Sequence, residues 1–381
     1  MAPGRATRPG ATLSGPMTRS EPAARLRIAD FDYELPPSAI AQVPIEPRDA
    51  ARLLVLDPGA SSPGRPALSH RVFGALGELL RPGDLLVVND SRVMRARLSA
   101  TRPGGGAAEV LLLRLLNGTA NRWEALVRPS RRIAPGAVIT LRNGDLVEVG
   151  ERLADGTRAV HFARDAHVVM AAVGETPLPP YIRDRSSSPG RYQTVYADPP
   201  GSAAAPTAGL HFTAELLRSL EAAGVGHAHV TLHVGLDTFR PLEGTFVDEH
   251  HIHREWYEIP HATEVAIARA RREGGRVVAV GTTSVRVLES AGRGRRSSGW
   301  TDLYITPPHE FSEVDALVTN FHLPRSSLLV LITAFVQAGM HAANPLEARD
   351  TLLAAYGTAL AQGYRFFSFG DAMFIGRTPA E

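Results

Sequence analysis

The sequence predicts an α/β main domain on a parallel or mixed, barrel-like sheet, with a small antiparallel β-barrel domain inserted into it. Short strand patterns without long helices fill residues 66–162, strands alternate with helices from about residue 166, and another buried strand pattern precedes both. Alternation of strands and helices favours a largely parallel sheet, whereas closely spaced strands favour a small barrel or sandwich. We expect residues 28–65 and 166–381 to form the main domain and residues 66–165 the inserted barrel.

The N-terminal region has two parts of different composition. Residues 1–27 are rich in Gly, Pro, Ala, Ser and Arg and lack a hydrophobic segment, so we expect a disordered tail rather than a signal peptide. The run EPRDAARLLVLD at 46–57 then leads from a polar loop into a buried strand. Because this strand precedes the β-rich section, we expect it to pair with strands of the later α/β section.

The β-rich section consists of short apolar and β-branched runs separated by Gly, Pro, Asn and Asp. These runs cover residues 85–88, 95–99, 108–115, 123–127, 137–141, 146–152 and 157–162. The glycines at 104–106 and the pair Asn143-Gly144 are typical of tight hairpin turns. The section therefore predicts an antiparallel barrel or sandwich.

The C-terminal half has the alternating pattern of an α/β domain. We expect strands at 229–234, 276–280, 302–305, 316–320 and 365–369. The intervening patterns predict helices at 214–223, 263–273, 284–291, 326–337 and 345–362. Ligands of such domains bind at the carboxyl ends of the strands, which is where several polar motifs fall.

Composition excludes several classes of function. Of 381 residues, 44% are hydrophobic and 21% charged, which is typical of a soluble globular protein. There is no cysteine and no lysine, which excludes disulfides, thiolate sites, Schiff-base chemistry and a phosphate loop ending in lysine. No run reaches the roughly 18 apolar residues of a membrane span. We expect a cytoplasmic protein without a membrane segment.

The charge pattern permits nucleic-acid binding without requiring it. The formal net charge is +2, and every basic side chain counted in it is arginine. Arginines cluster at 92, 95 and 97, at 128, 131 and 132, and at 293, 295 and 296. Each cluster is either a solvated face or a phosphate-binding surface.

The stretch AAPTAGLHFT at 204–213 leads from a polar loop into a helix. Thr213 is a plausible N-cap, because apolar residues at helical spacing begin just after it. His211 would then lie beside the free N–H groups of a helix start, where an anion or polar ligand is favoured. The alternative is an ordinary capped helix with a polar loop.

Three further motifs place polar groups just beyond buried strands. In VVAVGTTSVRVLES at 277–290, Gly281 allows close approach of a ligand, and Thr282, Thr283 and Ser284 add donors beside a helix start. In LVTNFHLPRSSLL at 317–329, Asn320 can read a ring edge and His322 can move a proton. In YRFFSFGDAMFI at 364–375, Asp371 can orient a histidine or bind a hydroxyl. Each could instead be an ordinary strand-end turn.

Histidines are dense between residues 227 and 261. A metal hydrolase built on His250, His251 and His253 is one hypothesis, although their spacing is not a known ligand pattern. His233, at the expected end of a strand, is the better functional candidate.

Taken together, these motifs resemble the S-adenosylmethionine:tRNA ribosyltransferase-isomerase family. The resemblance runs from about residue 31 to 375 and also includes GDLLVVNDSRVMRARL at 83–98, LVRPSRR at 126–132, PLPPYIR at 177–183, RYQTVYA at 191–197 and VTLHVG at 230–235. Ordered motifs of this length are very specific. The resemblance implies a β-barrel inserted into an α/β domain.

The resemblance also implies a reaction. The family transfers the ribosyl part of S-adenosylmethionine to 7-aminomethyl-7-deazaguanine at the tRNA wobble position and isomerises it to an epoxycyclopentane, which gives epoxyqueuosine and releases adenine and methionine. The sulfonium acidifies the neighbouring ribose carbon, so a placed base can take a proton, and the amine attacks the anomeric carbon as adenine leaves. S-adenosylmethionine is a substrate, and no prosthetic group or metal is implied.

Residue roles follow from the matching motifs. We expect acid–base groups at His211, His233, His322 and Asp371. We expect substrate-binding residues at Arg48, Asp49, Asn89, Arg92, Tyr192, Gln193, Thr207, Gly209, Gly281, Thr282, Thr283, Ser284, Arg286 and Asn320. The expected partners are the tRNA and S-adenosylmethionine, and the chain is expected to act as a monomer.

The sequence departs from the family pattern at several positions. They are Thr176, Leu236, Asp237, Ile252, Arg254, Pro308, His309 and Phe369. Asp237 adds a charge and a Cβ where glycine is usual. The alternative hypothesis is therefore a diverged paralogue that acts on another acceptor, or that binds S-adenosylmethionine or tRNA without turnover.

Overall fold

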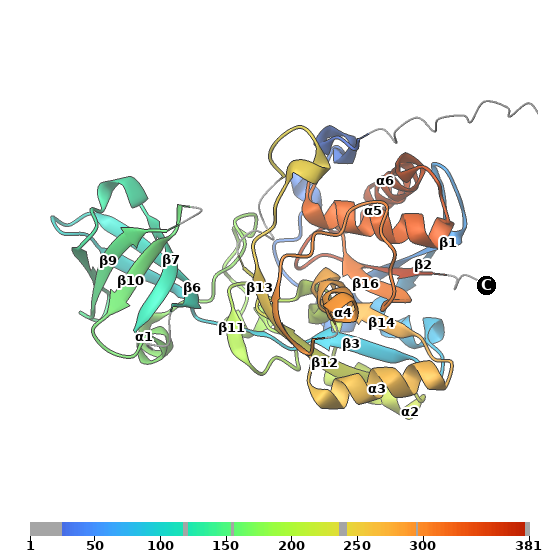
Figure 1. The fold of residues 1–381 in the computed structure, drawn as a ribbon, viewed down its shortest axis with the longest axis horizontal. Coiled ribbons are helices and arrows are strands. Elements are labelled where there is room, and N and C mark those ends of the chain that lie inside the picture. Colours follow the sequence, from blue (N-terminus) through green and yellow to red (C-terminus); the bar gives the residue numbers. More distant parts are fainter. Residues whose placement is uncertain (1–24, 117–120, 154–155, 236–241, 295, 378–381) are drawn as a thin grey trace, which may run out of the picture.

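The computed structural model describes residues 25–116, 121–153, 156–235, 242–294 and 296–377. These residues form a large mixed sheet covered by helices, with a small barrel beside it (Figure 1). The expected tail at 1–27 lies mostly outside the described residues. Its last part is described, and Arg25 pairs there with Asp248.

The large sheet has nine strands in the order β15-β13-β12-β3-β14-β16-β17-β1-β2. In that order they are Ser298–Thr301, Glu255–Glu258, Gly226–Leu232, Leu85–Asn89, Val277–Val280, Ala316–Asn320, Ala372–Gly376, Arg52–Ser62 and Arg65–Val72. The central strands β12, β3, β14 and β16 are parallel, so their carboxyl ends lie at the same edge. Strand β17 runs antiparallel to β16 and begins at that edge.

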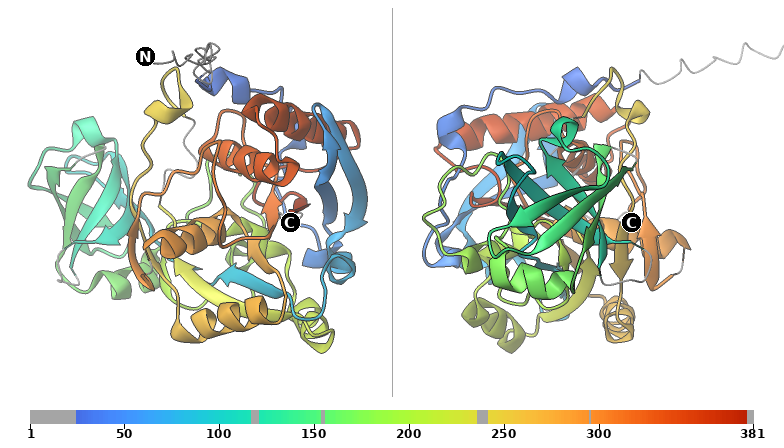
Figure 2. Two further views of the ribbon diagram at one scale, coloured as in Figure 1. Left: turned by 45° about the vertical axis from the view of Figure 1, so that its right-hand side comes forward. Right: turned by 90° about the vertical axis from the view of Figure 1, so that its left-hand side faces the viewer.

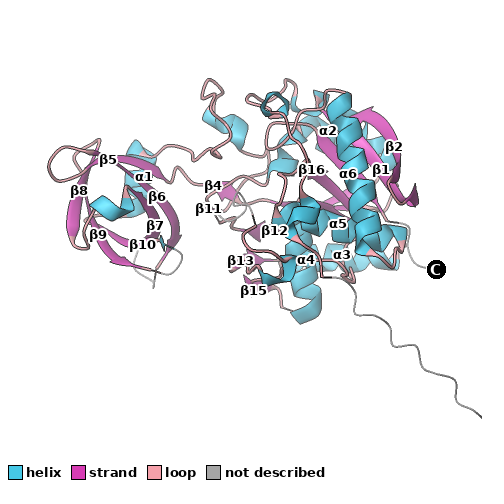
Figure 3. Cartoon of the chain, turned by 90° about the horizontal axis from the view of Figure 1, so that it is seen from above, coloured by secondary structure: helices cyan, strands magenta, loops and turns pink. Residues whose placement is uncertain are grey.

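Helices and 3-10 turns cover both faces of this sheet. One face carries α3 (His261–Arg272), α4 (Thr282–Gly294), α5 (Ser327–Met340) and α6 (Pro345–Ala361), whose apolar residues share one core with alternate strand residues. The other face packs on α2 (Ala214–Ala222) and the 3-10 helix η4 (Phe73–Leu79). In Figure 3 the long helices α5 and α6 lie together over the sheet.

The barrel is closed by six antiparallel strands in the order β10-β7-β6-β5-β8-β9. In chain order they are β5 (Arg97–Thr101), β6 (Ala107–Leu115), β7 (Arg122–Arg128), β8 (Ala137–Leu141), β9 (Leu146–Arg152) and β10 (Arg158–Phe162). Their inward residues form one core, against which α1 (Ala166–Val173) also packs. The left view of Figure 2 shows the barrel beside the helix-covered sheet, and the right view shows it in front of the sheet.

Shorter elements connect these two parts. Strands β4 (Arg92–Val93) and β11 (Pro200–Ser202) pair in parallel. The remaining 3-10 helices are Ile28–Phe31, Pro37–Ala39, Arg48–Ala50, Ser130–Arg132 (η5), Pro189–Tyr192, Thr207–His211 (η8) and Val247–Glu249. The hairpins expected at residues 104–106 and Asn143-Gly144 join β5 to β6 and β8 to β9.

The strands place the start of the barrel later than residue 66. Strands β2 and β3 fall within the expected insertion of 66–165, yet both belong to the large sheet. All of β3 is buried, as in a parallel strand covered on both faces, whereas the barrel strand β7 alternates between buried and partly exposed residues. The purely apolar run of β3 therefore fits the parallel sheet rather than the barrel.

Two expected strands are wrong. Residues 302–305 follow β15 rather than forming a strand, and the Leu303 carbonyl accepts a hydrogen bond from Arg286 Nε at 3.1 Å. Residues 365–369 form a tight loop, because the Asp371 N–H donates to the Arg365 carbonyl at 2.8 Å and Phe367 adopts φ = 69°. The last strand begins after this loop, as β17.

The five expected helices of the C-terminal half are confirmed within a few residues as α2 to α6. Thr213 caps α2, because its Oγ1 accepts a hydrogen bond from the Leu216 N–H at 3.0 Å. In the described part of the chain, no single helix is long and apolar enough to cross a membrane; α5 and α6 meet that test only as a pair with a 110° bend between them.

Candidate active site

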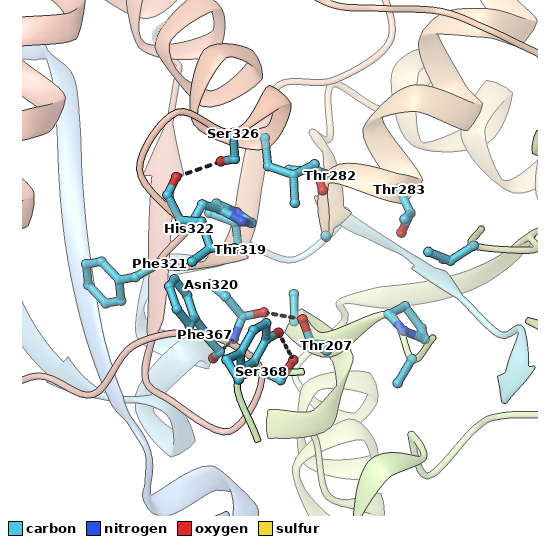
Figure 4. Close-up of a pocket in the computed structure, with 18 residues that line it drawn as sticks. Thr207, Thr282, Thr283, Thr319, Asn320, Phe321, His322, Ser326, Phe367 and Ser368 are labelled. Atoms are coloured by element: carbon cyan, nitrogen blue, oxygen red, sulfur yellow. Dashed lines mark hydrogen bonds between the residues drawn. The ribbon is translucent and has the colours of Figure 1, made fainter. Parts of the chain in front are cut away.

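A small cavity of about 60 Å³ lies at the carboxyl ends of β14 and β16 (Figure 4). We call it the inner cavity. Its walls come from the β14–α4 turn, the β16–α5 connection, the loop around η8 and the loop before β17. Six expected site residues line it: Thr207, Gly281, Thr282, Thr283, Asn320 and His322.

The β14–α4 turn supplies hydroxyl groups to the inner cavity. Gly281 has φ = 86°, a conformation that L side chains rarely adopt, and it turns the chain directly from the strand into α4. Thr282 and Thr283 follow it, and the buried Thr283 hydroxyl has no hydrogen-bond partner among the described residues. The Ser284 hydroxyl instead donates to the Val280 carbonyl at 2.8 Å. The turn therefore presents two of its three expected donors.

The end of β16 places a neutral histidine at the inner cavity. Nε2 of His322 lies 2.9 Å from Oγ1 of Thr319, and burial lowers the pKa of the imidazole to about 3. Asn320 accepts a hydrogen bond from the Thr207 hydroxyl at 2.9 Å and donates to the Phe367 carbonyl at 3.2 Å. Asn320 therefore links two walls of the cavity, and its amide group is already engaged rather than free to hydrogen-bond to the edge of a ligand ring.

The sequence analysis did not single out two hydroxyl groups of this cavity. The hydroxyls of Tyr181 and Ser368 lie 2.7 Å apart, and both residues line the cavity. They fall within the quoted motifs PLPPYIR and FFSFGDAM. The neighbouring Phe367 has φ = 69°, and such uncommon backbone conformations cluster at functional sites.

A larger cleft of about 840 Å³ lies between the barrel and the large sheet. We call it the outer cleft. Its walls are strongly aromatic: all three tryptophans of the chain, Trp123, Trp256 and Trp300, line it. Val234 and Leu328 line both the outer cleft and the inner cavity, so the two spaces adjoin.

His233 lies in the outer cleft, directly after β12. Its Nδ1 is 2.8 Å from the Ser91 hydroxyl, and its ring stacks on Trp256 with centroids 5.4 Å apart. A Cβ at Gly201 would lie 2.4 Å from the ring, so only glycine allows this approach. Nε2 has no hydrogen-bond partner within the described ranges. Burial lowers the pKa of His233, which keeps the imidazole neutral at pH 7.

Arg286 and Glu255 form a buried ion pair on the wall of the outer cleft. Nη1 of Arg286 donates to Oε2 of Glu255, whose Oε1 accepts from the Gly235 N–H at 2.8 Å. Each side chain is only 10% exposed. Nη2 of Arg286 has no partner among the described residues and is a spare donor in the wall.

His211, one of the expected acid–base residues, lines neither the inner cavity nor the outer cleft. Its Nδ1 is 3.1 Å from the Ala208 carbonyl oxygen, and its Nε2 is 3.0 Å from that of Gly370. The ring stacks on Phe73. Both ring nitrogens are therefore occupied by the main chain, and the polarity of the surrounding loop did not reveal this.

Asp371, another expected acid–base residue, also lines neither cavity. Its Oδ1 accepts from the Arg52 N–H at 3.0 Å, and its Oδ2 accepts from the Arg365 N–H at 2.8 Å. The carboxylate thus ties the start of β1 to the loop before β17.

Other expected binding residues hold main-chain segments together and line neither cavity. Arg48 donates to the carbonyls of Gln193, Leu210 and Gly190, and the Arg92 guanidinium donates to those of Ala197 and Asp198. Gln193 exchanges two hydrogen bonds with the Val93 backbone.

The remaining expected binding residues also have structural contacts. Asn89 bridges β3 to Leu232, and Asp49 accepts from the Thr213 hydroxyl at 3.2 Å. Buried Tyr192 packs on Phe369, and Gly209 lies against Tyr196. For these residues the polarity of a motif reflects folding contacts rather than cavity walls.

The histidine cluster does not form a metal site in the described part of the chain, where no group of three His, Asp or Glu side chains is arranged to hold one. The His250 ring contacts Tyr304, and His251 Nδ1 lies 3.2 Å from the Glu249 carbonyl oxygen.

The departures from the family pattern fall in different places. Ile252 and Arg254 line the outer cleft, whereas Phe369 is buried and His309 packs on Phe311. Leu236 and Asp237 lie outside the described residues.

Comparison with known proteins gives consistent matches over almost the whole chain. The sequence profile of a family described as queuosine biosynthesis protein matches residues 28–375. A relative from Symbiobacterium thermophilum, named S-adenosylmethionine:tRNA ribosyltransferase-isomerase, is 48% identical over 362 residues, which cover 92% of this chain and 100% of the relative. A relative of the same name from Rubrobacter xylanophilus is 48% identical over 350 residues, 92% of this chain and 98% of its own.

A solved structure is also similar. The crystal structure of S-adenosylmethionine tRNA ribosyltransferase from Thermotoga maritima aligns with a TM-score of 0.51 and 38% sequence identity. The alignment covers 91% of this chain and 99% of that one.

Proposed function

Because the chain belongs to the queuosine biosynthesis protein family, we propose that it transfers and isomerises the ribosyl moiety of S-adenosylmethionine onto 7-aminomethyl-7-deazaguanine at the tRNA wobble position. The products are epoxyqueuosine in the tRNA, adenine and methionine. The observation that carries this proposal is the 48% identity to relatives named for this enzyme over 92% of the chain. The chain is an enzyme, and S-adenosylmethionine is its substrate rather than a prosthetic group.

His233 is the proposed base. The reaction begins when a base removes a proton from the ribose carbon beside the sulfonium, and the electron pair of that C–H bond stays on the carbon. A base must be neutral and must have a ring nitrogen that is free to accept a proton. His233 meets both requirements, because burial lowers its pKa and its Nε2 is free at the outer cleft.

The inner cavity is the proposed site for the polar end of S-adenosylmethionine. The Thr282 and Thr283 hydroxyls at the start of α4 can donate hydrogen bonds to its carboxylate, and the helix N-terminus favours a negative charge there. His322 is proposed as a neutral hydrogen-bonding group, because a pKa of about 3 leaves it uncharged and weakly basic.

The outer cleft is the proposed site for the acceptor nucleobase. Proteins that bind single-stranded RNA stack unpaired bases on aromatic side chains, and Trp256, Trp300 and Tyr304 provide such surfaces here. Arg286 Nη2 can donate to a carbonyl oxygen on the edge of the base. The exocyclic amine would then attack the anomeric carbon of ribose as the bond to adenine breaks.

The barrel is proposed to act as an inserted domain that closes one side of this site. Trp123, Glu124 and Thr157 bring barrel strands to the outer cleft. We further propose that the protein is a cytoplasmic monomer. Gel filtration with light scattering tests the monomer directly, and a stable dimer would contradict it.

A complementation experiment tests the function. The chain is expressed in a bacterial strain that lacks its own enzyme of this family but makes the deazaguanine precursor, and tRNA nucleosides are analysed by mass spectrometry. We expect epoxyqueuosine or queuosine to appear. Accumulation of the unmodified precursor, despite soluble protein that binds S-adenosylmethionine, would indicate binding without turnover and overturn the proposal.

A further inference from the structure

Three arginines project from one end of the barrel without partners. Arg128 ends β7, and Arg131 and Arg132 lie three and four positions further on, in η5. All three are exposed, and none has a hydrogen bond or ion pair from its side chain among the described residues. We call this group the arginine turn.

Three other arginines of the barrel region are each paired with an acid. Arg122 pairs with Glu151, Arg142 with Glu175 and Arg164 with Asp145. The strand register places Glu109 opposite Arg128, but the Glu109 carboxylate pairs with Arg97 at 3.7 Å. The arginine turn is therefore a local excess of positive charge rather than part of an ion-pair network.

A fourth arginine anchors the turn from below. Arg158 is fully buried, and its Nη1 donates to the carbonyls of Ile133 at 3.0 Å and Ser130 at 3.4 Å. Its Nε and Nη2 donate to the Gly150 carbonyl. Burial lowers the pKa of Arg158, and the like charge of Arg152 lowers it further. The barrel thus holds the turn rigidly and adds a cation beneath it, an arrangement that favours an anionic ligand.

The arginine turn and the outer cleft lie on the same strand. Trp123 and Glu124, near the start of β7, line the cleft, and Arg128 ends that strand. Five residues of strand separate Trp123 from Arg128, a distance of about 17 Å at roughly 3.3 Å per residue. A stacked nucleic-acid strand, which rises about 3.4 Å per phosphate, covers that distance in about five nucleotides.

We propose that the arginine turn binds the phosphate backbone of the tRNA whose modified base enters the outer cleft. This inference rests on the proposed function and adds a second contact for the same partner. Guanidinium groups bind phosphate oxygens in a bidentate manner, and such contacts fix the position of an RNA without reading its sequence. The turn therefore contributes to tRNA affinity and not to the chemical step.

The test compares triple variants with equal loss of charge. One carries Arg128→Gln, Arg131→Gln and Arg132→Gln; the matched control carries Arg122→Gln, Arg142→Gln and Arg164→Gln on the same barrel. Dissociation constants for tRNA carrying 7-aminomethyl-7-deazaguanine are measured by fluorescence anisotropy between about 50 and 200 mM salt. A third variant carries Arg128→Lys, Arg131→Lys and Arg132→Lys, which preserves the positive charge.

We expect the first variant to lower the slope of log affinity against log salt by about 2, since each phosphate contact contributes about 0.7. The control and the lysine variant should keep a slope close to that of the wild type. S-adenosylmethionine affinity and kcat at saturating tRNA should not change. Equal salt slopes in the first variant and the control would overturn the proposal that the arginine turn binds the tRNA backbone. Failure of the wild type to bind the tRNA at any salt concentration would instead overturn the proposed function.

Discussion

Ser91 holds the imidazole of His233 from the side opposite the outer cleft: its hydroxyl lies 2.8 Å from Nδ1, while Nε2 remains free. Ser91 is fully buried, and its own N–H donates to Asn89 Oδ1 at 3.1 Å. The segment from Asn89 to Ser91 at the end of β3 therefore positions the histidine that follows β12. A base at Nε2 requires the ring proton on Nδ1, and the Ser91 hydroxyl oxygen can accept a hydrogen bond from that N–H.

Replacing this hydroxyl should affect catalysis more than binding. In Ser91→Ala the ring loses one hydrogen bond, worth about 1 kcal/mol, and a defined tautomer, so kcat should fall about five- to tenfold. The KM for S-adenosylmethionine should stay unchanged. The control Thr333→Val removes a buried hydroxyl that bonds only the Leu329 carbonyl in α5. Equal kcat losses in both variants would refute a positioning role for Ser91.

Removing either of two neighbouring hydroxyls in the β14–α4 turn should have different effects, one on substrate binding and the other on stability. Thr283→Val removes a buried hydroxyl without a described partner, so the KM for S-adenosylmethionine should rise about tenfold while the melting temperature is kept or raised. Ser284→Ala removes the bond to the Val280 carbonyl and should lower stability with little change in KM. Steady-state kinetics and thermal unfolding check both variants. The reverse pattern would place the substrate elsewhere.

Replacing only one partner of the buried ion pair between Glu255 and Arg286 should destabilise the protein strongly. Glu255→Leu leaves the guanidinium buried and unpaired, and we expect the free energy of unfolding to fall by about 3–5 kcal/mol. Adding Arg286→Met should recover much of that loss, because no unpaired charge remains. Activity should stay low in the double variant, since the spare donor in the cleft wall is gone. Full activity there would show that Arg286 has only a structural role. Urea unfolding and adenine release measure the two effects.

Stability should fall in mild acid because of His322. The pKa of His322 is about 3 in the folded protein and near 6.5 in the unfolded chain. The stability that burial of the neutral ring allows is therefore fully present above pH 6.5. Between these values the unfolded chain binds the additional proton, and stability is lost as the pH falls. From pH 7 to pH 5 this group accounts for about 2 kcal/mol. His322→Gln should therefore lose about 2 kcal/mol less than the wild type in urea unfolding. Identical pH dependence would contradict burial of the neutral imidazole.

How far the sequence predicts this molecule depends on the kind of signal. Strands 146–152 and 316–320 agree residue by residue with β9 and β16, because alternation and a bounded apolar run are local properties. The apolar run of β3 is equally compatible with a barrel or a parallel sheet, and only its long-range partners decide between them. The aromatic run before β17 has the composition of a strand, but it forms a loop that is closed by the hydrogen bond from the Asp371 N–H to the Arg365 carbonyl.

For the site too, local sequence signals predict some features, whereas long-range contacts decide others. The rule that ligands bind at carboxyl ends of strands correctly brought Thr282, Thr283 and His322 together. It could not show that His211 and Asp371 face main-chain groups, because polarity does not reveal direction. Contacts between residues distant in sequence, such as those of Ser91 with His233, carry no signal within a single motif.

The most direct test of this account measures adenine and methionine release from S-adenosylmethionine by the wild type and His233→Gln, with and without tRNA carrying 7-aminomethyl-7-deazaguanine. The wild type should release both products in equal amounts, only when the tRNA is present. His233→Gln should bind S-adenosylmethionine normally and release them at least about 100-fold more slowly. Product release without tRNA, or an unimpaired His233→Gln, would contradict the proposal that this imidazole starts the reaction in the outer cleft.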